Sequence, residues 1–182
     1  MIMEYFLKSR RLGFRCWKEE DLPLAMETWG DAEMTIFTGG PFTPEAVQAR
    51  LADEILRMKE RGIQYWPVFL LDGDAHVGCA GLRPFNDEEQ IYELGYYVRR
   101  PFWGQGLARE AAQAVISHAF GTLGLNALFA GHHPLNEASR RVLLSVGFRE
   151  AGWEVYTPTG ILDPAYRLYK PGTARIGSML KE

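Results

Sequence analysis

The chain has 182 residues, of which 47% are hydrophobic, 24% charged and 13% aromatic, and its formal net charge is −3. This composition predicts one globular domain over residues 1–182 and excludes a disordered chain. The charge gives no general attraction to nucleic acid or to an anionic membrane, and no apolar run is long enough to span a bilayer, so we expect neither partner.

The N-terminal half alternates between strand and helix patterns. Residues 7–17 alternate with period two, as a half-buried strand does. Lys8, Arg10 and Arg11 come too early to leave room for the apolar core of a signal peptide, which predicts a cytoplasmic protein. The other elements predicted in this half are a short helix at 19–29, a helix at 44–58, and strands at 65–71 and 76–82 that a tight turn at 72–74 joins.

The C-terminal half continues this alternation. After a polar loop at 83–90, the predicted elements are a strand at 91–98, a glycine-rich turn at 101–106, a helix at 107–119, a strand at 125–131, a helix at 136–146 that Gly147 ends, and a hairpin of strands at 148–156 and 161–169. The order is therefore a strand, two helices, three strands, a helix, a strand, a helix and two strands. This order predicts an α+β fold (mixed α/β) and not a regular doubly wound sheet.

The segment 91–110 combines a strand, a glycine turn and the start of a helix. Gly104 and Gly106 permit a positive φ and let an outside group approach the backbone. The first turn of the following helix offers unpaired N–H groups and the positive end of its dipole, which together bind an anion. The segment therefore predicts a phosphate site built from backbone donors, which an acidic chain can form without a basic surface.

Three kinds of phosphate site compete for this segment. A P-loop needs a Lys and a Ser or Thr after its last glycine, where this chain has Leu107 and Ala108. A dinucleotide fingerprint needs a small residue in place of Arg109 and an acidic residue about 20 residues later, and none lies around Asn126. The third kind of site binds the pyrophosphate of coenzyme A.

Three groups of residues carry a resemblance to a known family, in the order in which that family has them. They are Glu93-Leu-Gly-Tyr96 with Phe102-Trp-Gly-Gln-Gly-Leu-Ala-Arg-Glu110, then Asn136-Glu-Ala-Ser139 with Val142-Leu and Val146-Gly-Phe148, and, at the start of the chain, Arg11-Leu12, Phe14-Arg15 and Glu20-Asp21-Leu22. Together they resemble the GNAT superfamily of N-acetyltransferases, and most closely its RimJ/RimL-like branch, which acetylates protein N-termini among other amines.

The resemblance implies a GNAT-like fold with acetyl-CoA as its co-substrate. The expected sheet is mostly antiparallel, has about seven strands, is splayed between the fourth and fifth strands and is flanked by about four helices. Coenzyme A is expected in this wedge, where its pantetheine arm pairs with the backbone of Tyr97, Val98 and Arg99 and receives a hydrogen bond from Asn136. The pyrophosphate is expected on the glycine turn, which comprises Trp103, Gly104, Gln105, Gly106, Leu107 and Ala108.

Two positions depart from the family pattern. Pro101 stands where the superfamily usually has Gln or Arg, three residues before the first glycine, and it donates no N–H, so Arg99 or Arg100 would have to compensate. Leu143 stands where a tyrosine often serves as the general acid, which leaves Ser139, expected near the thioester sulfur, as the nearest substitute.

Acetylation of an amine needs a neutral nucleophile, so a general base is useful. Glu93 is the first candidate because its strand runs into the glycine turn, and its alternative role is an edge carboxylate paired with an arginine. Glu154 is the second candidate, and it is otherwise an ordinary solvent-facing strand residue. The backbone N–H of Val98 is expected to polarise the thioester carbonyl.

The other chemically able side chains predict no further centre. Cys16 and Cys79 are too few for a disulfide scaffold or a four-cysteine zinc site, and Cys79 lies in a strand of small residues that predicts packing. His132 and His133 are adjacent, which does not suit a metal pair on a helix, so no metal is expected; both are placed at the substrate end of the cleft.

The resemblance favours the α-amino group of a protein or peptide as the acceptor. Two alternatives stay open. One is a small-molecule amine such as an amino acid, a polyamine or an antibiotic, and the other is a non-catalytic coenzyme A-binding module, which the replacement of the tyrosine by Leu143 would suit. A homodimer is compatible with the sequence, which neither requires nor excludes it.

Overall fold

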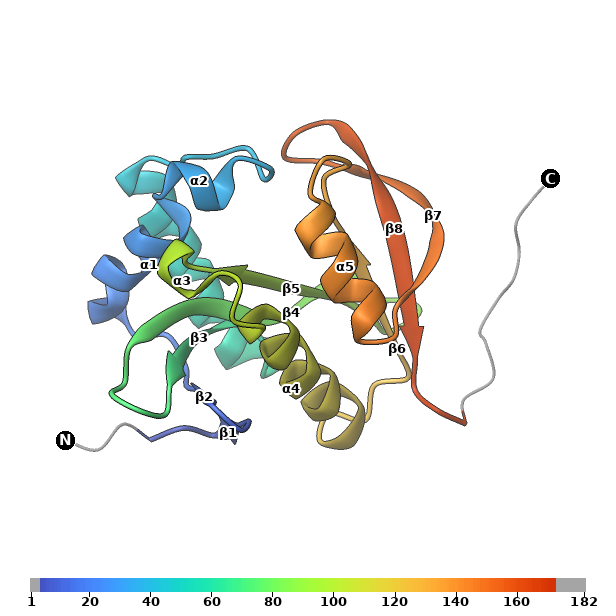
Figure 1. Ribbon diagram of the computed structural model, residues 1–182, viewed down its shortest axis with the longest axis horizontal. Coiled ribbons are helices and arrows are strands. Elements are labelled where there is room, and N and C mark those ends of the chain that lie inside the picture. The colour runs from blue at the N-terminus through green and yellow to red at the C-terminus, as the bar shows by residue number, and fades with distance from the viewer. Residues whose placement is uncertain (1–3, 173–182) are drawn as a thin grey trace.

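The computed structural model describes residues 4–172, and in this range eight strands form one sheet in the order β1-β2-β3-β4-β5-β6-β8-β7 (Figure 1). Neighbouring strands are antiparallel except β5 and β6, which are parallel. The strands are β1 (Leu7–Lys8), β2 (Leu12–Phe14), β3 (Tyr65–Leu70), β4 (His76–Asn86), β5 (Ile91–Val98), β6 (Ala127–Gly131), β7 (Arg149–Tyr156) and β8 (Ile161–Tyr169).

The helices begin and end where local capping chemistry favours it. Thr43 caps the longest helix by accepting the N–H of Ala46, Pro44 occupies its first turn, and Gly62 ends it in the left-handed conformation. The helices of the described range are α1 (Leu22–Trp29), α2 (Ala32–Thr35), α3 (Pro44–Arg61), α4 (Leu107–Gly121) and α5 (Glu137–Ser145), with short 3₁₀ turns η1 (Glu19–Asp21) and η2 (Arg100–Phe102).

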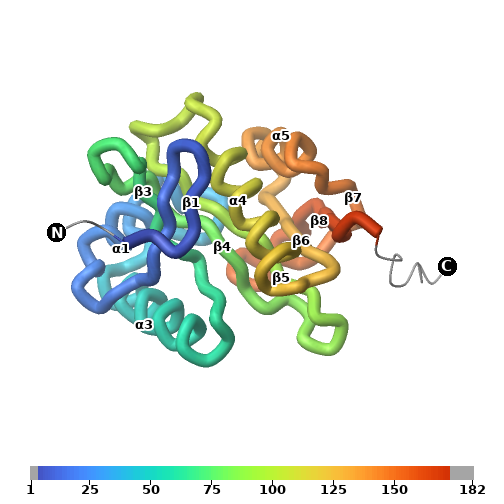
Figure 2. The backbone as a smooth tube through the Cα atoms, turned by 90° about the horizontal axis from the view of Figure 1, so that it is seen from below, coloured from blue at the N-terminus to red at the C-terminus, as the bar shows by residue number. Residues whose placement is uncertain are grey.

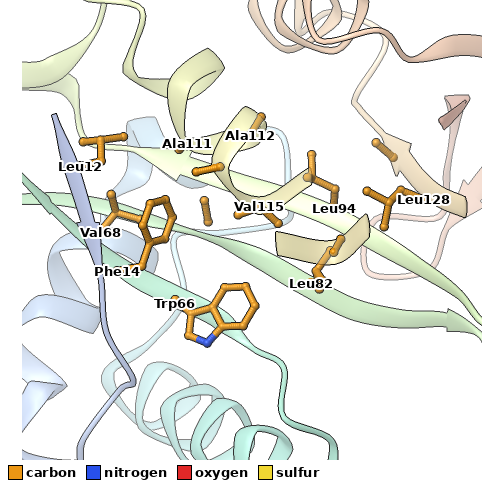
Figure 3. Packing of buried hydrophobic residues seen from close by; sticks show 14 of the residues in the cluster. Leu12, Phe14, Trp66, Val68, Leu82, Leu94, Ala111, Ala112, Val115 and Leu128 are labelled. Carbon is orange, nitrogen blue, oxygen red and sulfur yellow. The ribbon is translucent and has the colours of Figure 1, made fainter. Parts of the chain in front are cut away.

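Helices cover both faces of the sheet, with α4 and α5 on one face and α3 on the other (Figure 2). On the face of α4, the small residues Ala112 and Val115 let the helix pack closely on Trp66, Leu82 and Leu94 (Figure 3). On the opposite face, a separate core joins Trp29 of α1 and Val47 and Leu51 of α3 to Tyr65 and Cys79 of the sheet. We call these the α4 face and the α3 face.

The predicted fold class is confirmed: the sheet is mixed, mostly antiparallel, and changes to parallel pairing between β5 and β6. It has eight strands instead of about seven because the segment 7–17 turns back on itself and forms two short strands, β1 and β2, which pair with each other. The helix α2, which follows α1 after Asp31 caps its N-terminus, is a fifth helix that the sequence pattern did not predict.

The polar loop predicted at 83–90 is wrong in its first half, because β4 continues to Asn86. Arg83 pairs with Glu93 and Pro84 with Tyr92, so this stretch is held by its neighbour β5 and not by its own strand propensity. The register shifts between Pro84 and Asn86, where a proline interrupts the ladder. Among helices in the described range, none has the length and apolar character needed to cross a membrane.

Candidate functional site

The parallel strands β5 and β6 separate soon after they meet. They pair only at Tyr92 with Leu128 and at Glu93 with Phe129. Beyond Glu93, β5 continues to Val98 without a partner on its β6 side, so this half of the strand borders a gap in the sheet (Figure 1).

A cavity of about 820 Å³ occupies this gap. Its wall includes Leu94 and Tyr96, whose side chains pack with the core of the α4 face, and Tyr97, which packs with the core of the α3 face. Since successive side chains of a strand point to opposite faces, a cavity lined by both sets passes through the sheet.

The glycine turn forms one end of the cavity on the α4 face. Gly104 and Gly106 have φ values of 73° and 74°, and Gly106 immediately precedes α4. In the part of the chain that the structure describes, no amide N–H from Gly104 to Arg109 donates a hydrogen bond to a protein acceptor. These donors and the helix dipole together make a site for an anion.

A network from the turn between β1 and β2 holds the glycine turn in place. Glu110, in the first turn of α4, accepts hydrogen bonds from Ser9 Oγ, Arg11 N and Arg11 Nε, each 2.7 Å from a carboxylate oxygen. Arg11 Nη2 also donates to the carbonyl oxygen of Gln105 at 3.1 Å. Burial acts to raise the pKa of Glu110, but these hydrogen bonds outweigh it and lower the pKa. The carboxylate of Glu110 beside the anion site is therefore ionised, and its negative charge is balanced by Arg11.

Hydrogen bonds at the end of β5 turn particular main-chain groups toward the gap. The N–H of Arg99 donates to the carbonyl oxygen of Val77 on β4 at 2.8 Å. Since main-chain groups alternate along a strand, those of Val98 face the opposite side, where β6 has diverged. The indole N–H of Trp103 donates to the carbonyl oxygen of Val98 and closes the turn against the strand, which leaves the N–H of Val98 facing the gap.

Most predicted site residues lie on the cavity wall, and two do not. The side chain of Arg99 points away, with Nη1 2.8 Å from the carbonyl oxygen of His76 and 3.1 Å from Glu27, and the predicted contact of its backbone with the cofactor stays a prediction. Gln105 is exposed and donates from Nε2 to the carbonyl oxygen of Pro101 at 3.1 Å. The predicted residues that the cavity brings together are Glu93, Tyr97, Val98, Trp103, Gly104, Gly106, Leu107, Ala108, Asn136, Ser139 and Glu154.

A pair of hydroxyl groups from β5 and α5 lies on the cavity wall. Asn136 caps α5 by accepting the N–H of Ser139 at 3.0 Å, and Ser139 Oγ lies 2.9 Å from the hydroxyl of Tyr96. Burial raises the pKa of Tyr96 to about 12, against the lowering effect of the hydrogen bond with Ser139. Tyr96 therefore stays protonated at neutral pH. The sequence pattern did not single out Tyr96 because a tyrosine inside a strand is typical of a packing residue. Leu143 of α5, which replaces the family's usual tyrosine, is buried in the core.

A group of aromatic and charged side chains lines the cavity on the α3 face. Burial raises the pKa of Glu93, and the nearby Arg83 and Arg50 act in the opposite direction. In the described residues, the Glu93 carboxylate forms neither an ion pair nor a hydrogen bond within the protein. Burial together with Tyr97 and Glu93 raises the pKa of Tyr156 to about 12, so these groups lie near one another. Glu93 is thus a poorly solvated carboxylate that faces open space.

His132 and His133 lie on the cavity wall, with hydrogen bonds that define their tautomers. Nδ1 of His133 is 3.1 Å from the N–H of Leu135 and must accept from it, so the proton of neutral His133 is on Nε2. Nδ1 of His132 lies 2.8 Å from the carbonyl oxygen of His133 and must donate to it. Cys79 is buried outside the cavity, and burial raises the pKa of its thiol to about 12, which leaves it unreactive.

Comparison with known proteins gives consistent matches along most of the chain. A family model described as the acetyltransferase (GNAT) domain matches residues 11–149. The uncharacterized N-acetyltransferase p20 of Bacillus licheniformis is 30% identical over 151 residues, which cover 80% of this chain and 83% of that protein.

Solved structures share the fold. A GNAT-family acetyltransferase from Bacillus anthracis superposes with a TM-score of 0.76 at 24% identity, over 90% of this chain and 97% of the other. RimL, the ribosomal L7/L12 alpha-N-protein acetyltransferase, in complex with coenzyme A, gives a TM-score of 0.73 at 18% identity, over 88% of this chain and 95% of the other.

The environment of Glu93 predicts a stability gain when its charge is removed. Burial holds the pKa of Glu93 in the folded state above its value in the unfolded state, so the folded state binds the carboxyl proton more tightly. The free energy of unfolding therefore falls as the pH rises from the unfolded-state pKa through the folded-state pKa. We expect Glu93→Gln to raise the free energy of unfolding at neutral pH, and the gain to vanish below the ordinary glutamate pKa of about 4.3.

Urea unfolding at the two pH values measures this difference. The exposed Glu89→Gln is the matched control and should change stability at neither pH. A Glu93→Gln variant that is less stable than the wild-type protein at neutral pH would contradict the burial argument.

Proposed function

The chain belongs to the GNAT acetyltransferase family and is an N-acetyltransferase, and from this premise we propose that its acceptor is the α-amino group of a protein or peptide. The observation that carries the proposal is the cavity through the sheet, which joins the glycine turn and the hydroxyl pair on the α4 face to Glu93 on the α3 face. Such a passage lets a thioester and an amine meet from opposite sides.

Acetyl-CoA is the co-substrate of this fold, and the free backbone donors suggest where it binds. We assign the pyrophosphate to the amides between Gly104 and Ala108, where no protein acceptor competes. The pantetheine arm has two amide groups and runs along the unpaired side of β5, in the place that a neighbouring strand would take. Asn136, whose side-chain oxygen is already used by the cap, offers its amide N–H to the arm.

The reaction then needs four groups of this chain. The amine nitrogen attacks the thioester carbon, an N–C bond forms and the C–S bond breaks. Glu93 accepts the proton that the nitrogen loses, and its raised pKa makes it a stronger base than an exposed glutamate. The N–H of Val98 donates to the developing oxyanion. Ser139, oriented by Tyr96, donates a hydrogen bond to the departing sulfur, which then takes a proton from water.

Two considerations favour an α-amino group over a lysine side chain. An α-amine has a pKa of about 7.7–8.0 and is partly neutral at physiological pH, whereas a lysine near 10.4 requires much more help from a base. RimL, which shares the fold, is named for acetylation of an α-amine on a ribosomal protein. A single buried carboxylate is a sufficient base for the less demanding of these two amines.

The acceptor is tested with two peptides of one sequence that contains an internal lysine. One peptide has a free N-terminus and the other an acetylated N-terminus, so that only the lysine amine is available. We expect release of the coenzyme A thiol, measured with a thiol reagent, with the first peptide alone. Equal release with the blocked peptide would place the activity on lysine, and turnover only with small amines would reject a peptide acceptor.

The cofactor assignment is tested by strain in the glycine turn. At Gly104, φ is 73°, which a β-branched residue rarely adopts, so Gly104→Val should displace the amides from the pyrophosphate and weaken coenzyme A binding by tenfold or more, about 1.4 kcal/mol. Calorimetric titration with coenzyme A measures the loss.

The matched control is Gly73→Val, because Gly73 has a φ of 78° in the turn between β3 and β4, outside the cavity. It should impose similar backbone strain and leave the affinity for coenzyme A unchanged. If both variants bind coenzyme A as the wild-type protein does, the glycine turn is not the pyrophosphate site.

A further inference from the structure

Two carboxylates face each other on the hairpin that forms the far wall of the cavity. Glu154 of β7 is the direct cross-strand partner of Asp163 on β8, and both residues line the cavity. Directly opposed residues of an antiparallel pair project from the same face, and like charges in this arrangement repel each other. The pair therefore places two negative charges on one face of the hairpin, an arrangement that favours a positive charge between or beside them.

Asp163 in particular is buried, and in the part of the chain that the structure describes no cation forms an ion pair with it. It is only 7% exposed, and its Oδ1 atom is buried without a hydrogen-bond partner. Within residues 4–172, neither Asp163 nor Glu154 forms an ion pair. Burial raises the pKa of Asp163, and the nearest groups that act against it are His133 and His132. A buried, unpaired carboxylate is costly, so its place in a cavity wall indicates an external cation.

The surroundings suit an organic cation better than a metal ion. Phe37 stacks on His133 beside the pair, with ring centroids 4.9 Å apart, and both rings line the cavity. Aromatic faces attract ammonium and guanidinium groups and accommodate the alkyl chain that carries them. In the described part of the chain, no group of three His, Cys, Asp or Glu side chains is placed to hold a metal ion.

The pair lies on a different part of the cavity wall from the proposed base. In the sheet order β5-β6-β8-β7, Asp163 is two strands from β5 and Glu154 is three. Neither Asp163 nor Glu154 is among the charged groups that act on the pKa of Glu93, the proposed base on β5, so the pair lies apart from the group that would take the proton of the reacting amine. The cation that the pair binds is therefore a second charged group.

We propose that Asp163 and Glu154 form a subsite for a second cationic group of the acceptor, an ammonium or guanidinium group carried several ångströms from the reacting amine. The inference rests on the proposed function, because it requires that the acceptor is an amine and that it binds in this cavity. For a peptide acceptor, it predicts a preference for an N-terminus followed closely by lysine or arginine.

Cadaverine, a linear diamine, and pentylamine, its monoamine counterpart, test the subsite without turnover. Each is titrated calorimetrically into protein saturated with coenzyme A, which carries no acetyl group to transfer. We expect the wild-type protein to bind cadaverine at least about tenfold more tightly than pentylamine, because one charge-assisted hydrogen bond contributes a free energy of that order. Asp163→Asn should lose this preference. Equal affinity of the wild-type protein for the two amines would overturn the proposal.

The control variant is Glu150→Gln, which removes the same charge from the same hairpin but outside the cavity, where Glu150 lies 3.4 Å from Arg140. It should keep the preference for the diamine. A loss of preference in Glu150→Gln as large as that in Asp163→Asn would mean that net charge, and not the subsite, attracts the diamine.

Thermal unfolding separates a binding role from a structural one. Because Asp163→Asn removes a buried unpaired charge, the free variant should melt at or above the temperature of the wild-type protein, and a lower melting temperature would assign the carboxylate to the fold. Failure of the proposed function is distinct, since absent turnover with every peptide would reject the peptide acceptor and leave the diamine preference unaffected.

Discussion

The site depends on one interruption, the divergence of β5 from β6 after Glu93. Backbone N–H and C=O groups in a sheet require partners, and β5 keeps its partners on the β4 side alone from Leu94 to Val98. An interior strand left open in this way is a costly arrangement for a protein to maintain without a ligand. It becomes favourable when an extended molecule with amide groups of its own, such as the pantetheine arm, completes the ladder. The same divergence creates the passage in which a thioester on one face and an amine on the other can react.

The sheet also separates two electrostatic environments. On the α4 face, free amides and a helix dipole serve a polyanion, while Arg11 neutralises the carboxylate of Glu110 that would oppose it. On the α3 face, Glu93 and the pair of Glu154 and Asp163 offer negative charge to an amine. A net charge of −3 is therefore compatible with a highly charged anionic co-substrate, because each ligand meets a local field and not the average charge of the chain.

Features encoded over a few neighbouring residues could be predicted from the sequence, and those that need distant partners could not. The glycine turn before α4 and the helix predicted at 136–146 follow from local sequence, and both form where they were predicted, the helix as α5. The continuation of β4 past Leu82 depends on pairing with β5, so the residues from Arg83 onward were predicted as a loop. The contact of Tyr96 with Ser139 joins two elements 43 residues apart, and the burial of Asp163 depends on a hairpin folded against the cavity. The contact of the Arg99 backbone with the cofactor stays a prediction, while the direction of its side chain, toward a carbonyl oxygen of β4, depends on a distant partner.

Amide hydrogen exchange with and without coenzyme A tests the central claim most directly, because it observes the open edge of β5 and the glycine turn residue by residue. Bound coenzyme A should slow exchange at the amides from Gly104 to Ala108 and at Val98, and leave the turn at Gly73 as it was. If saturating coenzyme A slows exchange elsewhere but the amides of Gly104 to Ala108 and of Val98 exchange as fast as in the free protein, the account is contradicted.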